Sequence, residues 1–411
     1  MRFRTMIAAL AASAVLPVSG AQATDLEVTH WWTSGGEAAA VAEFAKAFDA
    51  TGNHWVDGAI AGSGGVARPI MISRITGGDP MGATQFNHGR QAEELVQAGL
   101  MRDLTELAEK EGWADVIGDK KLLDSCTLDG KIYCVPVNIH SWQWIWLNRH
   151  VYEDNGLAVP TNWDEFVASA PKLREKGIIP LAMGNQPWQA SGAFGVIAIA
   201  IAGVDSWLAV NRDKDAEVAG GPVYAKVFQA AADARELRKG SNVQDWNQAT
   251  NLVITGQAAA QIMGDWAQGE FQVAGKVAGV DYDCLPGLGV NPIVSTDGDA
   301  FYFPKLDDPA KSEAQLELAS VMFSPDTQVA FNLKKGSMPV RTDVDISKAN
   351  ACMQKGLALL KEGKIVPSGN QLLSPDTQGQ IEDLMTEFWS SDALSAEDAQ
   401  KRYAEIIANA D

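Results

Sequence analysis

The sequence predicts an α/β fold with sheets covered by helices on both faces. Short apolar strand patterns alternate with segments of helical periodicity along the chain after residue 24. About 390 residues follow the N-terminal leader described below, which is enough for two domains of ordinary size. No low-complexity, repeated or Pro-rich segment separates two halves, so if the chain forms two lobes we expect it to pass between them more than once.

The first half of the chain after the leader begins with a strand and a helix. Residues 26–30 alternate apolar and polar side chains, as a half-buried strand does. Helical spacing places Val41, Phe44 and Phe48 on one face of a helix over 37–48. The other expected elements are polar loops at 58–65 and 85–88, a helical stretch ending near 77–80, helices at 91–100 and 104–112, and one buried strand over 135–148.

The second half repeats the alternation of strands and helices. Residues 160–166 start a helix, with Thr161 or Asn162 as the N-cap and two acids in its first turn. We expect strands at 178–183, 259–264 and 300–304, helices at 193–204, 223–238, 247–255 and 314–321, and a helical C-terminal part from 346 onward with a break at 365–373.

The N-terminus has the pattern of a secretory signal peptide over residues 1–23. Arg2 and Arg4 form the positive region, an apolar core follows, and Ala21-Gln22-Ala23 has the small residues of a cleavage site. The most apolar later segment, 193–204, is short and rich in Ala and Gly, so we expect a buried helix there. The sequence therefore predicts a soluble protein exported to the periplasm.

Acidic residues outnumber basic ones. The formal net charge is −19, and it becomes −21 when Arg2 and Arg4 leave with the leader. Nucleic acids and anionic membrane surfaces repel such a protein, so we expect neither as a partner. The charge favours a neutral or cationic small ligand, or serves solubility alone.

Four cysteines in an exported chain indicate disulfides. Cys126 and Cys134 each lie four residues from Gly130, in a predicted hairpin with Asp129-Gly130 at its tip, so they can face each other. Cys284 and Cys352 would then pair by default. The sequence has no CxxC motif and no His/Cys cluster, so we expect no metal and no cofactor.

Two adjacent tryptophans end the first predicted strand. Trp31 and Trp32 point to opposite faces, so at most one of them fits the core cleanly. A flat indole covers the apolar face of a sugar, while carboxylates, amides and ammonium groups meet its hydroxyls. Glu37 opens the following helix and is a candidate for that polar role, although it also compensates the helix dipole. This combination suggests sugar binding.

Other segments repeat the combination of polar and aromatic residues at predicted strand ends. Each has a plain structural reading as a solvated loop, a buried histidine or a core residue. Together they have the composition that a ligand cleft in an α/β protein needs. The segments are Gln85-Phe-Asn-His88, His140-Ser-Trp142, Gln186-Pro-Trp188, Met263-Gly-Asp-Trp266, Thr296-Asp-Gly-Asp299 and Lys335-Gly-Ser-Met-Pro-Val-Arg341.

Signatures of catalysis are weak by comparison. The chain has no GxSxG, HExxH or Walker motif, and Gly62-Ser-Gly-Gly65 lacks the following GK[ST]. Paired carboxylates for glycoside hydrolysis could exist among so many acids, but no spacing selects a pair. We therefore expect a binding protein rather than an enzyme.

These residues together resemble the extracellular solute-binding proteins of ABC sugar importers, in the group related to maltose-binding protein, and within it the glucose-binding branch. The resemblance covers essentially the whole chain after the leader. The motifs that carry it are His-Trp-Trp-Thr-Ser-Gly-Gly-Glu (30–37), Gly-Lys-Ile-Tyr-Cys-Val-Pro (130–136), Pro-Thr-Asn-Trp-Asp-Glu-Phe (160–166), Gly-Gln-Ala-Ala-Ala-Gln-Ile-Met-Gly-Asp-Trp (256–266) and Lys-Gly-Ser-Met-Pro-Val-Arg (335–341).

The resemblance implies a type II-like periplasmic binding protein fold, in which two α/β lobes close by a hinge on a ligand in the cleft. It implies a first lobe of 24–136 plus about 296–345 and a second lobe of 137–295 plus about 346–411. For the site it implies an aromatic pair at Trp31 and Trp32, hydroxyl acceptors at Glu37 and at Asp299 (or Asp297), a polar contact at Gln85, a stacking ring at Trp266 and a donor at Lys335.

The chain departs from the family pattern at Gln371, where some members of the branch have histidine. Gln can still donate and accept, so the change bears on which sugar is preferred. We expect His88, His140 and Trp188 to complete the site, with His88 as a candidate for the missing imidazole. The predicted function is capture of glucose or a similar aldose by a monomer and its delivery to an ABC permease; the alternatives are a disaccharide or polyol ligand, or a secreted carbohydrate-active enzyme.

Overall fold

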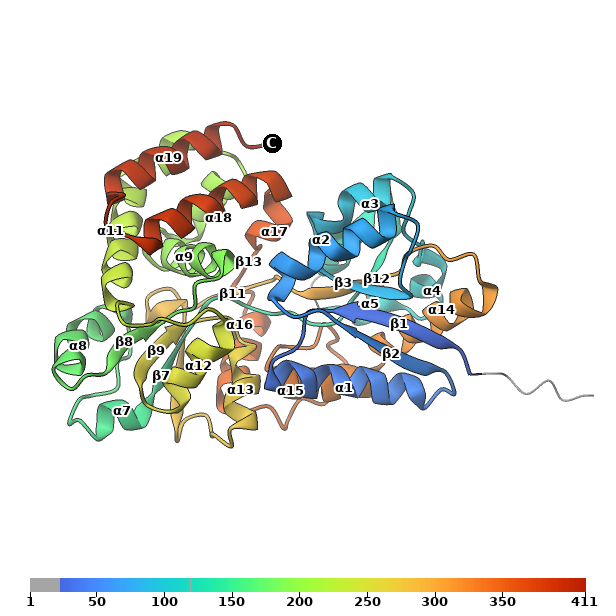
Figure 1. Cartoon of the computed structure of the whole chain (residues 1–411), viewed down its shortest axis with the longest axis horizontal. Helices are drawn as coiled ribbons and strands as arrows, with labels where there is room; N and C mark the ends of the chain where they lie inside the picture. The colour runs from blue at the N-terminus through green and yellow to red at the C-terminus, as the bar shows by residue number, and fades with distance from the viewer. Residues whose placement is uncertain (1–22, 119) are drawn as a thin grey trace, which may run out of the picture.

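Two β-sheets, one in each lobe, organise the chain, and the expected two-lobe α/β architecture is confirmed (Figure 1). The computed structural model describes residues 23–118 and 120–411. The predicted signal peptide, apart from Ala23, lies outside the described residues.

The first lobe is built on a five-stranded mixed sheet with the order β2-β1-β3-β12-β6. β1 pairs in parallel with β2 and β3, and β12 lies antiparallel between β3 and β6. β12 therefore enters this sheet from much later in the chain. The strands are β1 (Asp25–His30), β2 (His54–Ala59), β3 (Ala83–Asn87), β6 (Cys134–Pro136) and β12 (Asp299–Tyr302).

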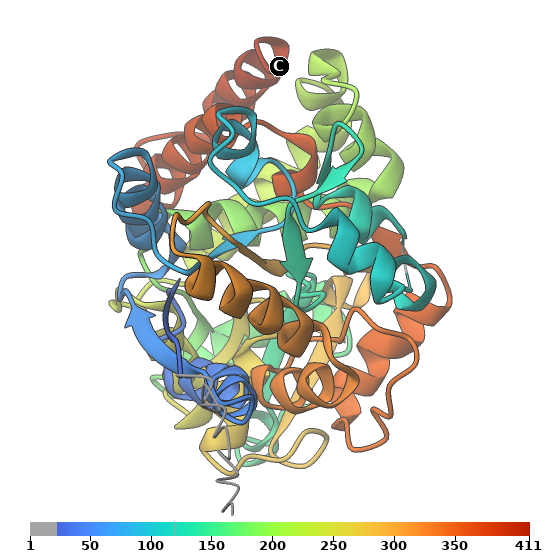
Figure 2. The same cartoon turned by 90° about the vertical axis from the view of Figure 1, so that its right-hand side faces the viewer.

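Helices cover this sheet, and α14, α15 and α1 pack against one another (Figure 2). Trp32, Phe44 and Phe331 stack in the core beneath them, with ring centroids 4.3–6.4 Å apart. The helices are α1 (Gly35–Asp49), α2 (Ser63–Thr76), η1 (Arg90–Ala92), α3 (Glu93–Gln97), α4 (Thr105–Lys110), α5 (Trp113–Val116), α6 (Lys120–Asp124), α14 (Pro309–Phe323) and α15 (Pro325–Lys335).

The second lobe has a four-stranded sheet with the order β10-β7-β9-β8, made of β7 (Trp144–Asn148), β8 (Ile179–Ala182), β9 (Ala258–Ile262) and β10 (Tyr282–Pro286). Its helices are α7 (Arg149–Glu153), α8 (Trp163–Glu175), α9 (Pro187–Asn211), α10 (Ala216–Ala219), α11 (Pro222–Leu237), α12 (Trp246–Ile254), α13 (Ala267–Val273), η2 (Gly287–Gly289), α16 (Ala351–Lys361), α17 (Gly369–Leu372), α18 (Pro375–Ser390) and α19 (Ala396–Ala408). The side chain of Asn162, not Thr161, caps α8 by accepting from the Glu165 N–H at 3.0 Å.

Helix α9 is longer than the predicted 193–204 because Pro187 starts it early and a second helical segment follows directly after a kink at Gly203. By length and composition it is the one described helix that could cross a membrane. It packs against α11 and α18, and half of its most apolar window is buried inside the protein. A core helix passes the same length and composition test, so we interpret α9 as the core helix of the second lobe.

Three chain segments join the lobes, as the expected multiple crossing requires. The first runs from β6 to β7, the second from β11 (Val294–Ser295) to β12, and the third from α15 to α16. β11 pairs in parallel with β13 (Ile365–Val366) beside them. Bridges join Ile139 to Met338 and His140 to Asp297, so all three segments lie side by side at the interlobe junction. The exact lobe boundaries given above stay a prediction.

Several predicted elements are wrong, for reasons of tertiary context. The single strand over 135–148 is two strands, because residues 137–143 form the first crossing. The loop at 85–88 is mostly strand β3, whose polar side chains are buried at the junction rather than solvated. Strand β2 has no counterpart among the predicted elements, and the helix at 91–100 is only η1 followed by the short α3.

Both expected disulfides are confirmed. Cys126 and Cys134 flank the hairpin of β4 (Thr127–Leu128) and β5 (Lys131–Ile132) and are bonded to each other. The Asp129-Gly130 tip has positive φ at both residues, as a tight two-residue hairpin turn requires. The Cys284–Cys352 disulfide joins β10 to α16. It therefore anchors the third crossing segment to the second lobe at the point where that segment enters the lobe.

Candidate functional site

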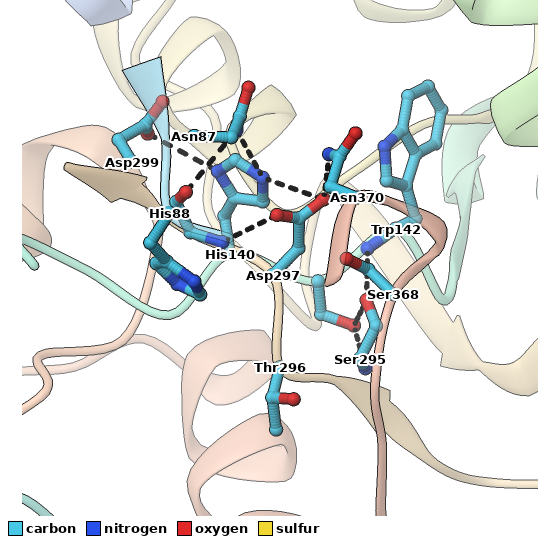
Figure 3. A network of polar contacts seen from close by, with 12 residues as sticks. Asn87, His88, His140, Trp142, Ser295, Thr296, Asp297, Asp299, Ser368 and Asn370 are labelled. Atoms are coloured by element: carbon cyan, nitrogen blue, oxygen red, sulfur yellow. Dashed lines mark hydrogen bonds and ion pairs between the residues drawn. The ribbon is translucent and has the colours of Figure 1, made fainter. Parts of the chain in front are cut away.

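A buried charged triad lies where the first two crossing segments meet. His140 comes from the first crossing, and Asp297 and Asp299 come from the second. His140 Nδ1 lies 3.2 Å from Asp299 Oδ2, and Nε2 lies 3.6 Å from Asp297 Oδ2. Figure 3 shows the imidazole held between the two carboxylates. All three side chains are almost fully buried.

The carboxylates keep this imidazole charged. Burial alone would lower the pKa of His140, but Asp299 and Asp297 outweigh it and raise that pKa to about 10. Burial likewise opposes ionisation of the two carboxyls, yet His140 holds the pKa values of Asp297 and Asp299 below their usual range. The triad is therefore ionised at neutral pH.

Amide side chains satisfy the remaining carboxylate oxygens of the triad. Gln85 Nε2 donates to Asp299 Oδ1 at 2.8 Å, and Asn138 Nδ2 donates to Asp299 Oδ2 at 2.9 Å. Asn370 Nδ2 donates to Asp297 Oδ2 at 2.7 Å. Gln85 Oε1 in turn accepts from the backbone N–H of Trp31 at 3.0 Å. The network thus connects the first tryptophan of the aromatic pair to the crossing segments.

A second buried ion pair comes from the first lobe. Lys335 Nζ, at the end of α15, lies 2.7 Å from Glu37 Oε1 in the first turn of α1. Burial raises the pKa of Glu37 in spite of this lysine and of the Ser34 hydroxyl that donates to it. The ammonium group also lies 5.4 Å from the ring centre of Trp32 and 5.9 Å from that of Trp266. Lys335 is thereby placed between the two lobes.

The second lobe contributes an aromatic wall. Trp266, directly after β9, lies edge-on to the rings of His140 and Trp142, with centroids 5.0 Å away in both cases. Trp142 is in turn 5.4 Å from Trp188 at the start of α9. Trp142 and Trp188 are only partly buried. Indole faces and charged groups therefore meet at one junction.

Some buried polar atoms here have no hydrogen-bond partner within residues 23–118 and 120–411. The three considered for the site are Asp265 Oδ1, Gln268 Oε1 and Trp188 Nε1, and other unpaired atoms lie elsewhere in both lobes. All three belong to the second lobe and lie on or beside segments that line the junction. Buried polar atoms are nearly always paired in folded proteins, so each unpaired atom at the junction is a place where a ligand group would supply the missing partner.

Direct contacts hold the lobes together in this structure. The Gly36 N–H, at the start of α1, donates to Glu270 Oε1 of α13 at 2.7 Å. Gln186 Nε2, which precedes α9, donates to Ser63 Oγ of α2 at 3.2 Å. Gln91 Nε2 reaches Asn370 Oδ1 at 3.4 Å. The structure is therefore a closed arrangement, with side chains of both lobes packed against each other.

The structure brings most of the predicted site residues to this junction. They are Trp31, Glu37, Gln85, His140, Trp188, Trp266, Asp299, Lys335 and Gln371. Gln371 lies on α17 and bonds to Thr296 of the second crossing, with Nε2 donating to the Thr296 carbonyl at 3.1 Å.

Two predicted residues are packed inside the first lobe, although the Trp32 ring centre lies 5.4 Å from Lys335 Nζ. Trp32 is a core residue of the first lobe, because it fills the space between Phe44, Phe301 and Phe331. His88 points away from the triad (Figure 3) and bonds to Ser125 Oγ through Nδ1 at 2.8 Å. The His88 ring packs against Gly298. Burial lowers the pKa of His88 to about 4, so this imidazole is uncharged at neutral pH. The assignment of His88 as the missing imidazole stays a prediction.

Other junction residues have no distinctive signal in the sequence. Asn138 and Asn370 are amides in segments of ordinary composition. Asp265 stands inside the Met263-Gly-Asp-Trp266 segment, where the indole beside it is the more conspicuous residue. Asp297 is predicted only as an alternative to Asp299, and both take part. Within the described ranges, no group of three or more His, Cys, Asp or Glu residues could hold a metal ion.

A separate polar surface groove of about 330 Å³ lies on the second lobe beyond β7. It is open to solvent and lacks the aromatic and charged residues described above. Its lining residues are Asn148, His150, Val151, Asp154, Asn155, Ile178, Ile254, Thr255, Gly256 and Lys276. We therefore place the candidate site at the junction, where indole rings, carboxylates, amides and the Lys335 ammonium group converge.

Known proteins match this chain along most of its length. The family model described as bacterial extracellular solute-binding protein matches residues 32–303. A probable sugar-binding periplasmic protein of Brucella suis biovar 1 (strain 1330) is 36% identical over 403 residues, covering 95% of this chain and 94% of that protein.

Solved structures match the fold. The bacterial solute receptor AcbH, described as having an exclusive preference for β-D-galactopyranose, aligns with a TM-score of 0.77 at 19% identity, covering 93% of this chain and 98% of its own. Maltose-bound T. maritima MalE3 aligns with a TM-score of 0.75 at 17% identity, covering 94% and 99%. Both matches cover the two lobes together.

Proposed function

Since this chain belongs to the bacterial extracellular solute-binding proteins, we propose that it captures a monosaccharide, glucose or a similar aldose, for an ABC importer. Proteins of this kind bind a sugar and pass it to a membrane permease, and relatives of this chain are periplasmic sugar-binding proteins. We propose further that the ligand is a single aldose, that the protein acts as a monomer, and that a cleaved leader exports it to the periplasm.

The observation that carries the proposal is the composition of the interlobe junction. Indole rings, carboxylates, amides and one ammonium group converge there from both lobes. A pyranose has apolar C–H faces and a rim of hydroxyls that both donate and accept, so it matches this mixture. We assign the ligand contacts to Trp31, Glu37, Gln85, His140, Trp188, Trp266, Asp299, Lys335 and Gln371.

The spacing of the junction supports a single sugar ring over a longer saccharide. Lys335 Nζ lies 5.9 Å from the ring centre of Trp266 across the junction, so little opening is needed to admit one ring between them. AcbH is described as binding one pyranose and MalE3 as binding maltose, so both sizes occur on this fold. A disaccharide or polyol ligand is the second candidate.

Replacing Trp266 or Lys335 with alanine is expected to weaken sugar binding by about tenfold to a hundredfold, or about 1–3 kcal/mol. Trp266→Ala removes an apolar face, and Lys335→Ala removes a donor and leaves Glu37 unpaired. Isothermal titration against glucose, galactose, mannose, xylose, maltose, trehalose and sorbitol measures the affinity and the preferred ligand.

Lys334→Ala is the matched control. Lys334 is the neighbouring residue on α15, and its exposed side chain forms an ion pair with Glu43 on α1 of the first lobe. It should bind sugar as the parent protein does. Unchanged affinity of both Trp266→Ala and Lys335→Ala would contradict the assigned site, whereas tight binding of only a disaccharide or polyol would correct the ligand.

The cross-lobe contacts provide a test of closure. A Cβ atom at Gly36 would lie 2.5 Å from the carbonyl carbon and 2.8 Å from Cα of Gly269 in the other lobe. Backbone atoms cannot yield as side-chain ends do, so Gly36→Ala should keep the lobes from closing fully. Because closure is what ligand contacts from both lobes stabilise, we expect affinity to fall by about tenfold or more.

Gly65→Ala serves as the control for closure, because a Cβ at that position of α2 meets nothing within 4 Å. Titration gives the affinities, and small-angle X-ray scattering with saturating sugar gives the radius of gyration. Gly36→Ala should stay expanded where the parent protein contracts. Equal contraction and equal affinity in both variants would show that the Gly36 contact is irrelevant to closure.

The alternative from another class is a carbohydrate-active enzyme. Turnover of a chromogenic glycoside by the purified protein would support it, whereas binding without turnover supports the proposal.

A further inference from the structure

Asp265 differs from every other carboxylate that we place at the junction. It lies between β9 and α13 in the second lobe, and only 2% of the residue is exposed. Its Oδ2 accepts from the Ser141 N–H at 2.9 Å, and its own N–H donates to the Ser141 carbonyl at 3.0 Å. These two bonds to the first crossing fix the direction of the side chain.

Its second oxygen is left without a donor. No partner for Oδ1 exists within residues 23–118 and 120–411. The cations that could reach it are engaged elsewhere, because Lys335 is paired with Glu37 and His140 lies between Asp297 and Asp299. A buried acceptor without a donor is costly, so this oxygen is a place where a donor from outside the chain would stabilise the protein.

We propose that Asp265 Oδ1 accepts a hydrogen bond from a hydroxyl of the bound sugar and is a specificity-determining contact of the second lobe. This inference rests on the proposed function, since it deepens the same site. An ionised carboxylate oxygen can accept a hydrogen bond but cannot donate one, so the geometry favours a ligand group that donates at this position. A sugar with a ring oxygen or an inverted hydroxyl there would leave Asp265 Oδ1 unpaired.

Protonation of Asp265 should then compete with the ligand. The charged groups that face it are His140 and Asp299 on the crossing segments and Lys335 on α15. Burial raises the pKa of Asp265 to about 7, against the opposing effects of His140, the Ser141 N–H and Lys335. A ligand hydroxyl favours the ionised form, so binding below this pKa must displace a proton.

The affinity for sugar should therefore rise with pH, by about tenfold between pH 6 and pH 8. The two histidines of this region titrate outside that window, because the pKa of His140 is raised to about 10 and that of His88 is lowered to about 4. The pH dependence is thus a signature of a carboxyl with a strongly raised pKa.

The test uses the whole protein without its leader and titrates it with glucose and the other sugars of the panel at pH 6 and pH 8. In Asp265→Asn, the amide oxygen must still face the Ser141 N–H, so the side chain presents an NH2 donor where an acceptor stood. We expect its affinity at pH 8 to fall at least tenfold and its pH dependence to disappear. Asp154→Asn, at an exposed carboxyl of the same lobe, should match the parent protein at both pH values.

Circular dichroism and the unfolding midpoint establish that Asp265→Asn is folded. If the parent protein binds sugar and Asp265→Asn keeps both its affinity and its pH dependence, the inference is overturned and the proposed function stands. If the folded parent protein binds no sugar of the panel, the proposed function fails and the inference fails with it. Loss of affinity without loss of the pH dependence would assign the titration to another group and overturn the inference as well.

Discussion

Replacing His140 with alanine is expected to lower the free energy of unfolding by about 3–5 kcal/mol, because it leaves two buried carboxylates without their cation. His140 is the only charged partner within 3.6 Å of either Asp297 or Asp299 in the described part of the chain. Amides bonded to these carboxylates supply dipoles but no compensating charge. The two aspartates then face each other as like charges at the junction of the lobes.

The size of this loss should depend on pH. The pKa of His140 is about 10 in the folded protein, above its ordinary value of 6.5, so its contribution is complete below about pH 6.5 and is lost as the pH rises through 10. The pKa values of Asp297 and Asp299 are lowered, so their contribution is present above about pH 4 and is lost in acid. The free energy of unfolding of the parent protein should therefore exceed that of His140→Ala by the largest amount between about pH 4 and pH 6.5.

Urea unfolding followed by tryptophan fluorescence, at several pH values, measures the difference. His150→Ala is the control, because His150 pairs with Asp281 on an exposed surface, where an ion pair contributes about 0–1 kcal/mol. A loss in His140→Ala no larger than in His150→Ala, or one that does not change with pH, would show that the triad is not ionised.

Removing the Cys284–Cys352 disulfide is the second change with a large expected effect. The bond closes a loop with a sequence separation of 68 residues, for which loop-closure entropy gives about 4 kcal/mol. The Cys126–Cys134 bond closes a separation of only 8 residues, for which the same model gives about 2.5 kcal/mol. Cys284→Ser with Cys352→Ser should thus destabilise the protein more than the other double replacement.

Chemical unfolding of the two double variants, measured without reductant, makes this comparison. The Cys126→Ser and Cys134→Ser protein is the matched control, since it also loses one buried disulfide. Thiol titration of the unreduced parent protein should find no free thiol, because all four cysteines are paired. The reverse order of stabilities would mean that native-state contacts, rather than loop length, determine how much each disulfide stabilises the protein.

Local signals are sufficient to predict some elements. The hairpin at Cys126–Cys134 follows from Asp129-Gly130 between two short strand patterns, and its turn, ladder and disulfide are all as expected. The first helix follows from the spacing of Val41, Phe44 and Phe48, which are buried on one face. In both cases the residues that specify the element are neighbours in the sequence.

Elsewhere the predicted elements are wrong because strands pair with segments that are distant in the sequence. The polar segment around Gln85 predicts a loop, but it forms strand β3, which pairs with β12, and the Gln85 side chain is buried against Asp299. The segment over 135–148 is apolar on most positions because both ends are buried strands, and nothing local marks the crossing between them. A pattern of hydrophobicity indicates that residues are buried, but it does not indicate in which lobe they are buried.

The candidate site is predictable in its kinds of residue rather than in its pairings. Of the aromatic pair, only contacts with Phe301 and Phe331, far along the chain, show that Trp32 belongs to the core. His140 has no charged residue near it in sequence, and its partners come from the second crossing. The role of Asp265 has no signal in the sequence because an unpaired oxygen is a property of the folded structure.

The position of β12 has a consequence for how this protein is made. β12 occupies the place between β3 and β6, yet it is synthesised long after both of them. Until residue 302 has been synthesised, one edge of β3 and both edges of β6 lack a partner strand, so the first lobe cannot complete its sheet as an N-terminal unit. Such late, non-local pairing makes folding slow. A nascent chain that ends before β12 therefore exposes strand edges that are free to pair with another chain.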